Sequence, residues 1–280
     1  MCEEYYGKVL VTGADGMLGQ DLCPMLEDCG YEVIETDIDN LDVTNELEVN
    51  RVIADVKPDY LIHCAAYTNV DKAEEEKDLS YKINTKGTEY VAKACAKNNV
   101  TMLYISTDYV FDGTKKEPYE IEDKTNPINE YGKTKLDGEL AVQKHCPQYY
   151  IIRTSWLYGH HGKNFVETMI SLADKPELKV VNDQIGCPTW TMDLSDAIIS
   201  IIEDEAEYGI YHACGGGSTT WFEFAKEIFE KMHLNVNLKP CTTDEFPRTA
   251  KRPNYSVMNN DGLLRDWKQA LQEYIELRVE

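Results

Sequence analysis

The chain alternates short apolar runs with longer stretches in which apolar residues recur at helical spacing. After the first run, for example, Leu18, Leu22 and Leu26 lie on one face of a helix. Strand-like runs that alternate with helical stretches are typical of βαβ units around a parallel sheet. The pattern therefore predicts an α/β fold with a doubly wound parallel sheet of the Rossmann kind. The predicted strands are residues 8–12, 32–37, 59–65, 101–106 and 149–154.

The pattern changes after Trp156, where the loops become longer and richer in proline and glycine. Residues 178–182 and 209–212 have the composition of short strands and lie among stretches with helical spacing. We therefore expect residues 1–156 to form the sheet domain and residues 157–280 to form mainly a smaller, intertwined lobe, with some segments returning to the core. The predicted helices of this lobe are residues 162–174, 192–204, 219–232 and 264–278.

The first predicted strand leads directly into a glycine-rich turn, in which Gly13, Gly16 and Gly19 are spaced by three residues. Glycines at this spacing allow a tight turn, a close approach of the backbone to a diphosphate, and close packing of the next helix. The diphosphate then lies at the helix N-terminus, where backbone amides favour an anion. The position after an N-terminal strand predicts dinucleotide binding, with an ordinary glycine-rich turn as the alternative.

Asp37 ends the second predicted strand, 18 residues after the last glycine of the turn. A carboxylate at this place accepts hydrogen bonds from the diol of an adenosine ribose and repels a 2′-phosphate. The local chemistry favours NADH over NADPH, although Asp39 and Asp42 can share the role and a solvated acidic loop is the alternative. The third predicted strand ends in Ala65 and Ala66, small residues at which a backbone can pass close to a cofactor.

Tyr131 and Lys135 are four residues apart and therefore lie on one face of a predicted helix. Thr107 follows the fourth predicted strand, at the carboxyl edge where open α/β sheets bind ligands. A hydride delivered to a carbonyl leaves negative charge on oxygen, and a phenol can supply the proton. A nearby ammonium is expected to lower the pKa of that phenol, and a hydroxyl can hold the oxygen. These residues predict a carbonyl reductase site.

Composition narrows the range of partners and compartments. The 280 residues include 28 Lys and Arg and 50 Asp and Glu, so the formal net charge is −22. Such a chain repels phosphate backbones and anionic lipid, which excludes nucleic acid and membranes as the expected partners. The nine cysteines, Cys2 among them, are scattered and never spaced as C-x-x-C, and residues 1–7 lack the pattern of a signal peptide. We therefore expect a cytoplasmic protein.

These motifs resemble the extended short-chain dehydrogenase/reductases and, within them, the dTDP-4-dehydrorhamnose reductases. The similarity extends over nearly the whole chain and rests on an ordered set of segments. They are residues 12–19 (TGADGMLG), 64–74 (CAAYTNVDKAE), 105–113 (ISTDYVFDG), 131–135 (YGKTK), 153–159 (RTSWLYG), 183–189 (DQIGCPT) and 252–256 (RPNYS). The resemblance implies NADPH- or NADH-dependent reduction of the C4 ketone of dTDP-4-dehydro-L-rhamnose, the last step of dTDP-rhamnose biosynthesis.

The resemblance also implies roles for single residues. Thr107, Tyr131 and Lys135 match the catalytic trio, with Tyr131 as proton donor and Lys135 also binding the nicotinamide ribose. The candidate substrate-binding residues are Val70, Asp71, Lys72, Thr107, Tyr109, Trp156 and Arg252, of which the two aromatic residues match sugar-facing positions. The candidate cofactor-binding residues are Gly13, Gly16, Met17, Leu18, Gly19, Asp37, Asp42, Val43, Ala65, Ala66, Tyr67, Tyr131 and Lys135.

Three features depart from the family pattern. Where some members bind magnesium through a glutamate, this chain has Asp193, so we expect no metal. The family often uses NADPH, which conflicts with the preference derived from Asp37 and leaves both cofactors open. The segment 258–265 is shorter than in other members. The oligomeric state, monomer or homodimer, is also left open.

Two other functions share these motifs. A related nucleotide-sugar epimerase or dehydratase also has the glycine turn and the Tyr/Lys pair, and Asp108 offers the kind of acid that a dehydratase needs. A non-catalytic regulatory subunit of this fold would bind a dinucleotide and a partner enzyme, although the complete trio argues against it. Only a reductase consumes the cofactor stoichiometrically.

Overall fold

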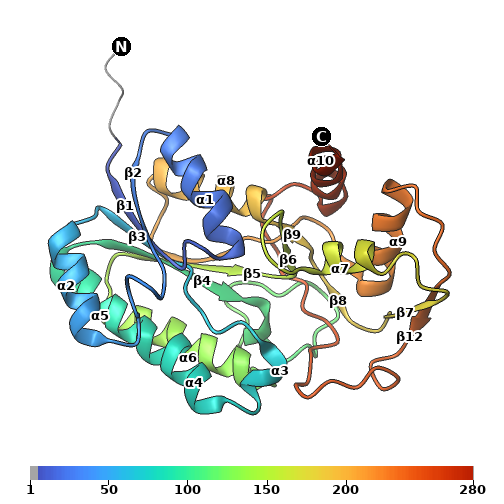
Figure 1. Cartoon of the computed structure of the whole chain (residues 1–280). Helices are drawn as coiled ribbons and strands as arrows, with labels where there is room; N and C mark the ends of the chain where they lie inside the picture. The colour runs from blue at the N-terminus through green and yellow to red at the C-terminus, as the bar shows by residue number, and fades with distance from the viewer. Residues whose placement is uncertain (1–5, 280) are drawn as a thin grey trace.

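A computed structural model of the chain describes residues 6–279, so Cys2 and most of the segment 1–7 lie outside the described residues. A six-stranded parallel sheet forms the centre, with strand order β10-β5-β4-β3-β1-β2 (Figure 1). Each of the predicted strands is present, which confirms the doubly wound parallel sheet. The strands are β1 (Lys8–Thr12), β2 (Glu32–Thr36), β3 (Tyr60–His63), β4 (Thr101–Thr107), β5 (Tyr149–Thr154) and β10 (Gly209–His212).

Helices cover both faces of the sheet (Figure 1). Along β1, Val9 and Val11 pack against the helices on one face, whereas Leu10 between them packs against the helices on the other. Because both faces are buried, the inner strands β1, β3, β4 and β5 each contain three or four consecutive apolar or aromatic residues, whereas the edge strand β2 has two exposed glutamates. The first face carries α1 (Met17–Asp28) and α8 (Thr191–Glu203), and the second carries α2 (Glu46–Val56), α5 (Thr88–Asn98) and α6 (Glu130–His145).

The chain reverses its direction across the sheet at β1. Strand β2 lies on one side of β1 and β3 lies on the other. The connections that leave the carboxyl ends of these strands therefore diverge and leave a crevice between them. The glycine-rich turn follows β1 directly, so it lies at this crevice.

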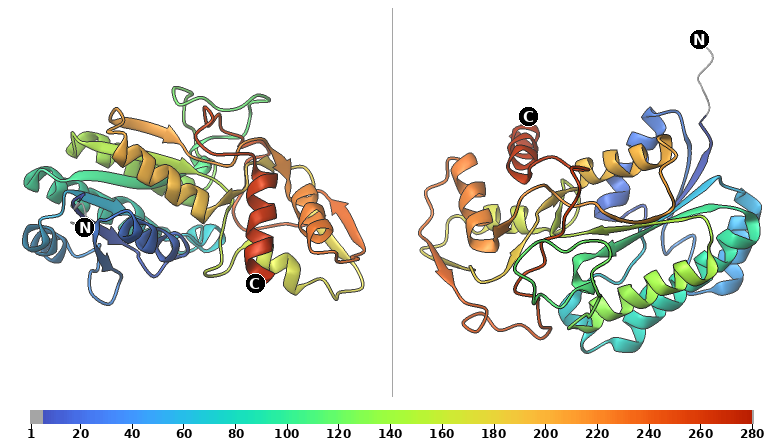
Figure 2. Two further views of the ribbon diagram at one scale, coloured as in Figure 1. Left: turned by 90° about the horizontal axis from the view of Figure 1, so that it is seen from above. Right: turned by 180° about the vertical axis from the view of Figure 1, so that it is seen from behind.

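The smaller lobe lies beside the carboxyl edge of the sheet (Figure 2). Its helices pack around the buried rings of Trp190, Phe224 and Tyr274. These helices are α7 (Phe165–Ser171), α9 (Trp221–Lys231) and α10 (Trp267–Val279). Short paired strands complete the lobe: β6 (Leu157–Tyr158) with β9 (Thr189–Trp190), β7 (Leu178–Val181) with β12 (Leu238–Cys241), and β8 (Ile185–Gly186) with β11 (Thr219–Thr220).

Two segments that follow Trp156 in the sequence belong to the sheet domain. Strand β10, predicted as a short strand of the lobe, pairs in parallel with β5 and becomes the sixth strand of the central sheet. Helix α8 packs against α1, with Leu194 and Ile198 in the same apolar cluster as Leu22. The functional division of the chain into residues 1–156 and 157–280 stays a prediction.

The remaining short elements surround the crevice. They are α3 (Val70–Ala73), α4 (Lys77–Tyr81), the π-helix η1 (Lys82–Gly87) and the 3₁₀ turn η2 (Asp108–Val110). None of the helices in the described part is long and apolar enough to cross a lipid bilayer. The eight cysteines of this part are free thiols.

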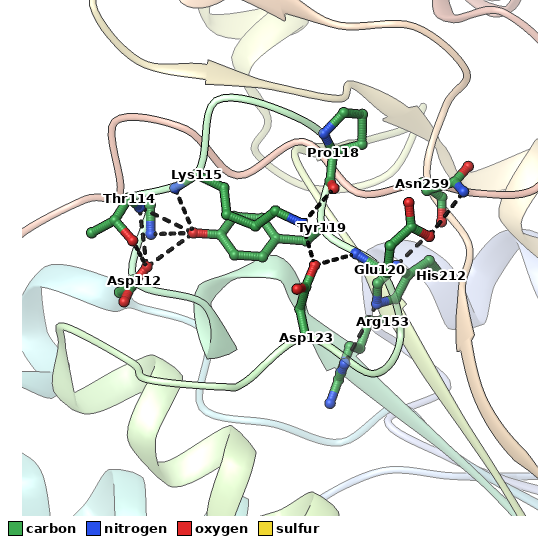
Figure 3. A network of polar contacts seen from close by, with 11 residues as sticks. Asp112, Thr114, Lys115, Pro118, Tyr119, Glu120, Asp123, Arg153, His212 and Asn259 are labelled. Atoms are coloured by element: carbon green, nitrogen blue, oxygen red, sulfur yellow. Dashed lines mark hydrogen bonds and ion pairs between the residues drawn. The ribbon is translucent and has the colours of Figure 1, made fainter.

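Tyr119 holds the loop after η2 against the C-terminal segment (Figure 3). Its hydroxyl accepts a hydrogen bond from the Gly113 amide at 3.0 Å and donates to Asp112 Oδ1 at 2.9 Å. Its backbone N–H donates to the Val257 carbonyl, and its carbonyl accepts from the Asn259 amide. The C-terminal segment is therefore held in place beside the end of β4.

A buried ion pair joins α6 to the strands below it. Glu139 on α6 accepts two hydrogen bonds from Arg153 on β5, at 2.9 and 2.7 Å, and one from Ser106 on β4 at 2.5 Å. Ser106, Arg153 and His212 are paired across β4, β5 and β10, so they project from the same side of the sheet. Glu139 is 1% exposed and Arg153 is 3% exposed. The pair therefore sets the position of α6 along the strands.

We expect Arg153→Met to lower the free energy of unfolding by about 3–5 kcal/mol, because it leaves the Glu139 carboxylate buried without its partner. The exposed pair of Arg51 and Asp55 supplies a matched control. Arg51→Met should change the free energy of unfolding by less than about 1 kcal/mol. Urea unfolding followed by circular dichroism measures both variants, and equal effects would contradict the role of the buried pair.

Candidate active site

A cleft of about 950 Å³ opens at the carboxyl ends of β1, β3 and β4, with residues of the smaller lobe on its other side. The predicted cofactor residues that line it are Gly13, Gly16, Met17, Leu18, Gly19, Asp37, Asp42, Val43, Ala65, Ala66, Tyr131 and Lys135. Tyr67 lies outside this lining, and its hydroxyl donates to Glu76 at 2.6 Å. Of the predicted substrate residues, Val70, Thr107, Tyr109 and Trp156 line the cleft, whereas Asp71, Lys72 and Arg252 do not.

The glycine turn has the shape that a dinucleotide diphosphate requires. Gly13 has a φ of +72°, and a Cβ atom on it would lie 2.6 Å from the backbone nitrogen of Ala65. A Cβ atom on Gly19 would overlap the backbone of Ala14, so α1 starts in direct contact with the turn. Gly16 is the N-cap of α1, and no side chain caps the helix. The amides of its first turn are therefore available to an anion.

Two of the acidic residues predicted near the ribose line the mouth of the cleft. Asp37 Oδ2 accepts a hydrogen bond from the Asp15 amide at 3.1 Å, which holds the carboxylate between the end of β2 and the glycine turn. Asp42 Oδ1 accepts from the Thr44 hydroxyl at 2.7 Å and so stabilises its own loop. Asp39 is exposed and lies outside the lining. Among these three carboxylates, Asp37 is the one hydrogen-bonded to the glycine turn, and its role at a ribose diol stays a prediction.

Thr107, Tyr131 and Lys135 meet at one side of the cleft. Thr107 ends β4, and the other two residues occupy successive turns of α6. The Tyr131 hydroxyl faces Thr107, whose hydroxyl acts to lower the pKa of the phenol. Lys135 Nζ donates to the Ile105 carbonyl at 2.6 Å and lies 4.1 Å from the centre of the Tyr104 ring. The structure thus brings together the three residues that the sequence suggests as catalytic.

Burial determines the charge states of this trio. It raises the pKa of Tyr131 to about 12, although the hydrogen bond with Thr107 acts in the opposite direction. It lowers the pKa of Lys135 to about 7. The expectation that the ammonium lowers the pKa of the phenol is therefore wrong for this structure, because the loss of water dominates. Tyr131 stays protonated across the neutral range, and Lys135 is partly protonated.

The cation expected at the substrate diphosphate is already paired. Arg252 donates two hydrogen bonds to Asp71, at 2.6 and 2.8 Å, and a further one to the Ala250 carbonyl at 2.7 Å. The positive charge of Arg252 is thus largely neutralised, and the pair ties the C-terminal segment to α3. Lys72 is exposed. The roles of these residues in substrate binding stay predictions.

The structure adds residues that the sequence did not indicate. Lys163 from the loop before α7 and Lys82 from η1 line the cleft and bring positive charge to it. Trp221, at the start of α9, stacks on Trp156 with ring centres 3.5 Å apart. Trp156 has a φ of +45°, a left-handed conformation that is costly for a bulky residue and needs such packing to persist. No local signal marks these residues, because packing between distant segments brings them to the cleft.

The carboxylate of Asp193 is paired with an arginine. Its carboxylate accepts two hydrogen bonds from Arg265, at 3.0 and 2.8 Å. Within residues 6–279, no three His, Cys, Asp or Glu side chains gather as a metal site would require. The expectation that the chain binds no metal stays a prediction.

The chain matches known proteins over nearly its whole length. The family model described as the RmlD substrate binding domain matches residues 7–279. The spore coat polysaccharide biosynthesis protein SpsK of Bacillus subtilis (strain 168) is 41% identical to this chain. The alignment covers 97% of this chain and 98% of SpsK.

Two solved structures are similar in both sequence and fold. A dTDP-4-dehydrorhamnose reductase from Clostridium acetobutylicum is 48% identical with a TM-score of 0.95, covering 98% of this chain and 100% of that chain. The dTDP-4-dehydrorhamnose reductase from Bacillus anthracis, solved in complex with NADP, is 42% identical with a TM-score of 0.94. That match covers 97% of this chain and 99% of the other.

Gly13→Ala should abolish dinucleotide binding, because the added methyl group would push the turn away from Ala65. Gly262→Ala is the matched control, since Gly262 has a φ of +80° and a Cβ atom there would meet nothing within 4 Å. Both variants carry the cost of a left-handed alanine, about 1–2 kcal/mol. Fluorescence titration with NADH and NADPH measures the affinities, and binding by Gly13→Ala as tight as that of the control would contradict the close approach.

Proposed function

The chain belongs to the dTDP-4-dehydrorhamnose reductase family, and we propose that it uses NAD(P)H to reduce the C4 ketone of dTDP-4-dehydro-L-rhamnose to dTDP-L-rhamnose. This reaction is the last step of dTDP-rhamnose biosynthesis. The observation that carries the proposal is that Thr107, Tyr131 and Lys135 line the same cleft as the glycine turn. Identities of 48% and 42% to reductases of this name support the same substrate class.

The shape of the cleft supports an assignment of residues to the cofactor. The glycine turn and the free amides of α1 suit the diphosphate, Asp37 suits the adenosine ribose, and Lys135 suits the nicotinamide ribose. When bound, the nicotinamide supplies a hydride to a carbonyl carbon. The Asp37 carboxylate disfavours a 2′-phosphate, while the relative from Bacillus anthracis was solved with NADP. We therefore propose that this chain accepts both cofactors.

Tyr131 is the proposed acid of the reaction. Its phenol is protonated at neutral pH, because burial raises its pKa to about 12. Tyr131 and Thr107 both line the cleft, and the phenol faces Thr107. As the carbonyl oxygen gains negative charge, Tyr131 Oη gives it a proton and Thr107 Oγ1 donates a hydrogen bond to it. The protonated form of Lys135 opposes the negative charge that remains on Tyr131 Oη.

The smaller lobe is the proposed second wall of the substrate site. Trp156 lines the cleft from this side, and Trp221 holds its ring by stacking. Tyr109 lines the same space from η2, and its phenol interacts with Arg252. Lys163 offers a cation for a diphosphate. We assign cofactor binding to residues 1–156 and substrate binding mainly to residues 157–280.

The purified protein should oxidise both NADPH and NADH in the presence of enzymatically generated dTDP-4-dehydro-L-rhamnose. Each sugar reduced should consume a single cofactor molecule, and NMR should identify the product as dTDP-L-rhamnose. A sugar product formed without loss of cofactor would instead support an epimerase or dehydratase. Lack of turnover with either cofactor by folded protein would contradict the proposed function.

Tyr131→Phe should lower kcat by about 10²–10⁴-fold, because the ring remains and the proton donor is lost. Its affinity for NADPH, measured by fluorescence, should stay within about twofold of the wild-type value. The reason is that the glycine turn and the amides of α1, and not the phenol, are proposed to hold the cofactor phosphates. Tyr109→Phe is the control within the same cleft, and it should lose less than about tenfold in kcat. A Tyr131→Phe rate close to that of Tyr109→Phe would place the proton donor elsewhere.

A further inference from the structure

Next to Thr107 lies a carboxyl group that the proposed reaction does not use. Asp108 begins η2 and is 2% exposed. Its Oδ1 lies 3.1 Å from Thr107 Oγ1. Its Oδ2 is buried and, within the described part of the chain, has no hydrogen-bond partner of good geometry. A buried acid is thus in direct contact with the hydroxyl that would hold the substrate oxygen.

The direction of the Thr107 proton depends on this acid. A threonine hydroxyl donates one hydrogen bond and accepts two. The Tyr109 amide, 3.2 Å away, can only donate, so it occupies one of the acceptor positions of Thr107 Oγ1. The other two neighbours are Asp108 Oδ1 and the Tyr131 hydroxyl.

An ionised Asp108 can only accept, so it takes the proton of the Thr107 hydroxyl. Thr107 Oγ1 then draws the Tyr131 proton toward itself and has none to offer a substrate. A neutral Asp108 instead donates its own proton to Thr107 Oγ1 and fills the second acceptor position. The protons of Thr107 and Tyr131 are then both free to point at a substrate oxygen.

The surroundings of Asp108 favour the neutral form. The titratable and polar groups that face it are Thr107, Tyr109, Tyr131, Cys214 and Ser256. These are hydroxyls and a thiol, and the guanidinium on the far side of Tyr109 is already paired with Asp71. Burial is the largest influence and raises the pKa of Asp108 to about 7, although the Ser256 and Thr107 hydroxyls and the backbone amides of Asp108 and Tyr109 lower it.

We propose that Asp108 is a positioning residue that acts in its neutral form: it donates a hydrogen bond to Thr107 Oγ1 and so directs the Thr107 hydroxyl at the substrate carbonyl oxygen. This role rests on the proposed function, because it requires a carbonyl in the cleft. Asp108 keeps its proton throughout, and the proton transferred to the substrate is that of Tyr131. This role differs from that of the acid in a dehydratase, which gives its proton away.

A double-mutant cycle in the full chain, assayed with NADPH and the ketosugar, separates this role from a structural one. Thr107→Val and Asp108→Ala should each lower kcat about 100-fold, as the loss of one donor to a developing oxyanion does, with KM within about threefold. In the Thr107→Val background, adding Asp108→Ala should lower kcat by less than about a further threefold, because Asp108 acts through Thr107. Asp108→Asn, whose amide can donate to Thr107, should keep at least about a third of the wild-type kcat.

The pH dependence gives a second kinetic readout. Wild-type enzyme loses the neutral acid as the pH rises through about 7, whereas asparagine does not ionise. The ratio of the Asp108→Asn kcat to the wild-type kcat should therefore rise between about pH 6 and about pH 8. Lys135, which also titrates near 7, is present in both enzymes, so its contribution cancels in the ratio.

The melting temperature gives a readout that needs no turnover. The folded chain holds the Asp108 proton up to a pH of about 7, whereas the unfolded chain loses it near 3.8, the ordinary pKa of an aspartic acid. Between these values the folded state binds more protons, so Asp108 makes the wild-type protein less stable as the pH rises. The Tm of Asp108→Asn minus that of wild type should therefore increase from about pH 5 to about pH 8.

The proposal would be overturned if Asp108→Ala lowered kcat by the same factor in the wild-type and Thr107→Val backgrounds. It would also be overturned if Asp108→Asn were as inactive as Asp108→Ala. A Tm difference that does not change with pH would show that Asp108 is already ionised in the folded protein and would overturn it too. Lack of turnover by folded wild-type protein is a distinct result, which contradicts the proposed function and this role with it.

Discussion

The buried pair of Glu139 and Arg153 is the interaction on which the geometry of the site depends. Arg153 stands on β5, and its neighbour Ser106 on β4 bonds to the same carboxylate. Thr107 is the next residue of β4, and Tyr131 lies about two turns before Glu139 on α6. The hydroxyl and the phenol are therefore held relative to each other by one network. Because both charges are buried, neither can exchange its partner for water at low cost, so a shift of α6 along the strands would be costly.

The same exclusion of water sets the proton states inside the cleft. It keeps Tyr131 a phenol, brings the pKa of Lys135 to about 7, and raises that of Asp108 to about 7. All three shifts favour the neutral form of a side chain, which is the expected effect of desolvation. In the proposed reaction, the carbonyl oxygen that gains negative charge would meet neutral donors whose protons are directed by their neighbours.

Positive charge is arranged locally in this acidic protein. A net charge of −22 would hinder the approach of anionic ligands if it were spread evenly over the cleft. Instead, the amides of α1 carry no capping side chain, and Lys82 and Lys163 line the rim, where both are exposed. Arg252, expected to add to this charge, is used to tie the C-terminal segment to α3 through Asp71. The cations of the cleft are thus partly different from those suggested by the motifs.

Local patterns in the chain were enough to predict the first five strands, the glycine turn and the spacing of Tyr131 and Lys135. Strands buried on both faces need continuous apolar runs, and Gly13 is required where a Cβ atom would meet Ala65. Folding was needed to pair β10 with β5, to stack Trp221 on Trp156, and to join Arg252 to a partner 181 residues away. It also raised the pKa of Tyr131, against the expectation from its lysine neighbour. The reason is physical: residue spacing and composition are properties of a short segment, whereas burial and contacts between distant segments exist only in the folded chain.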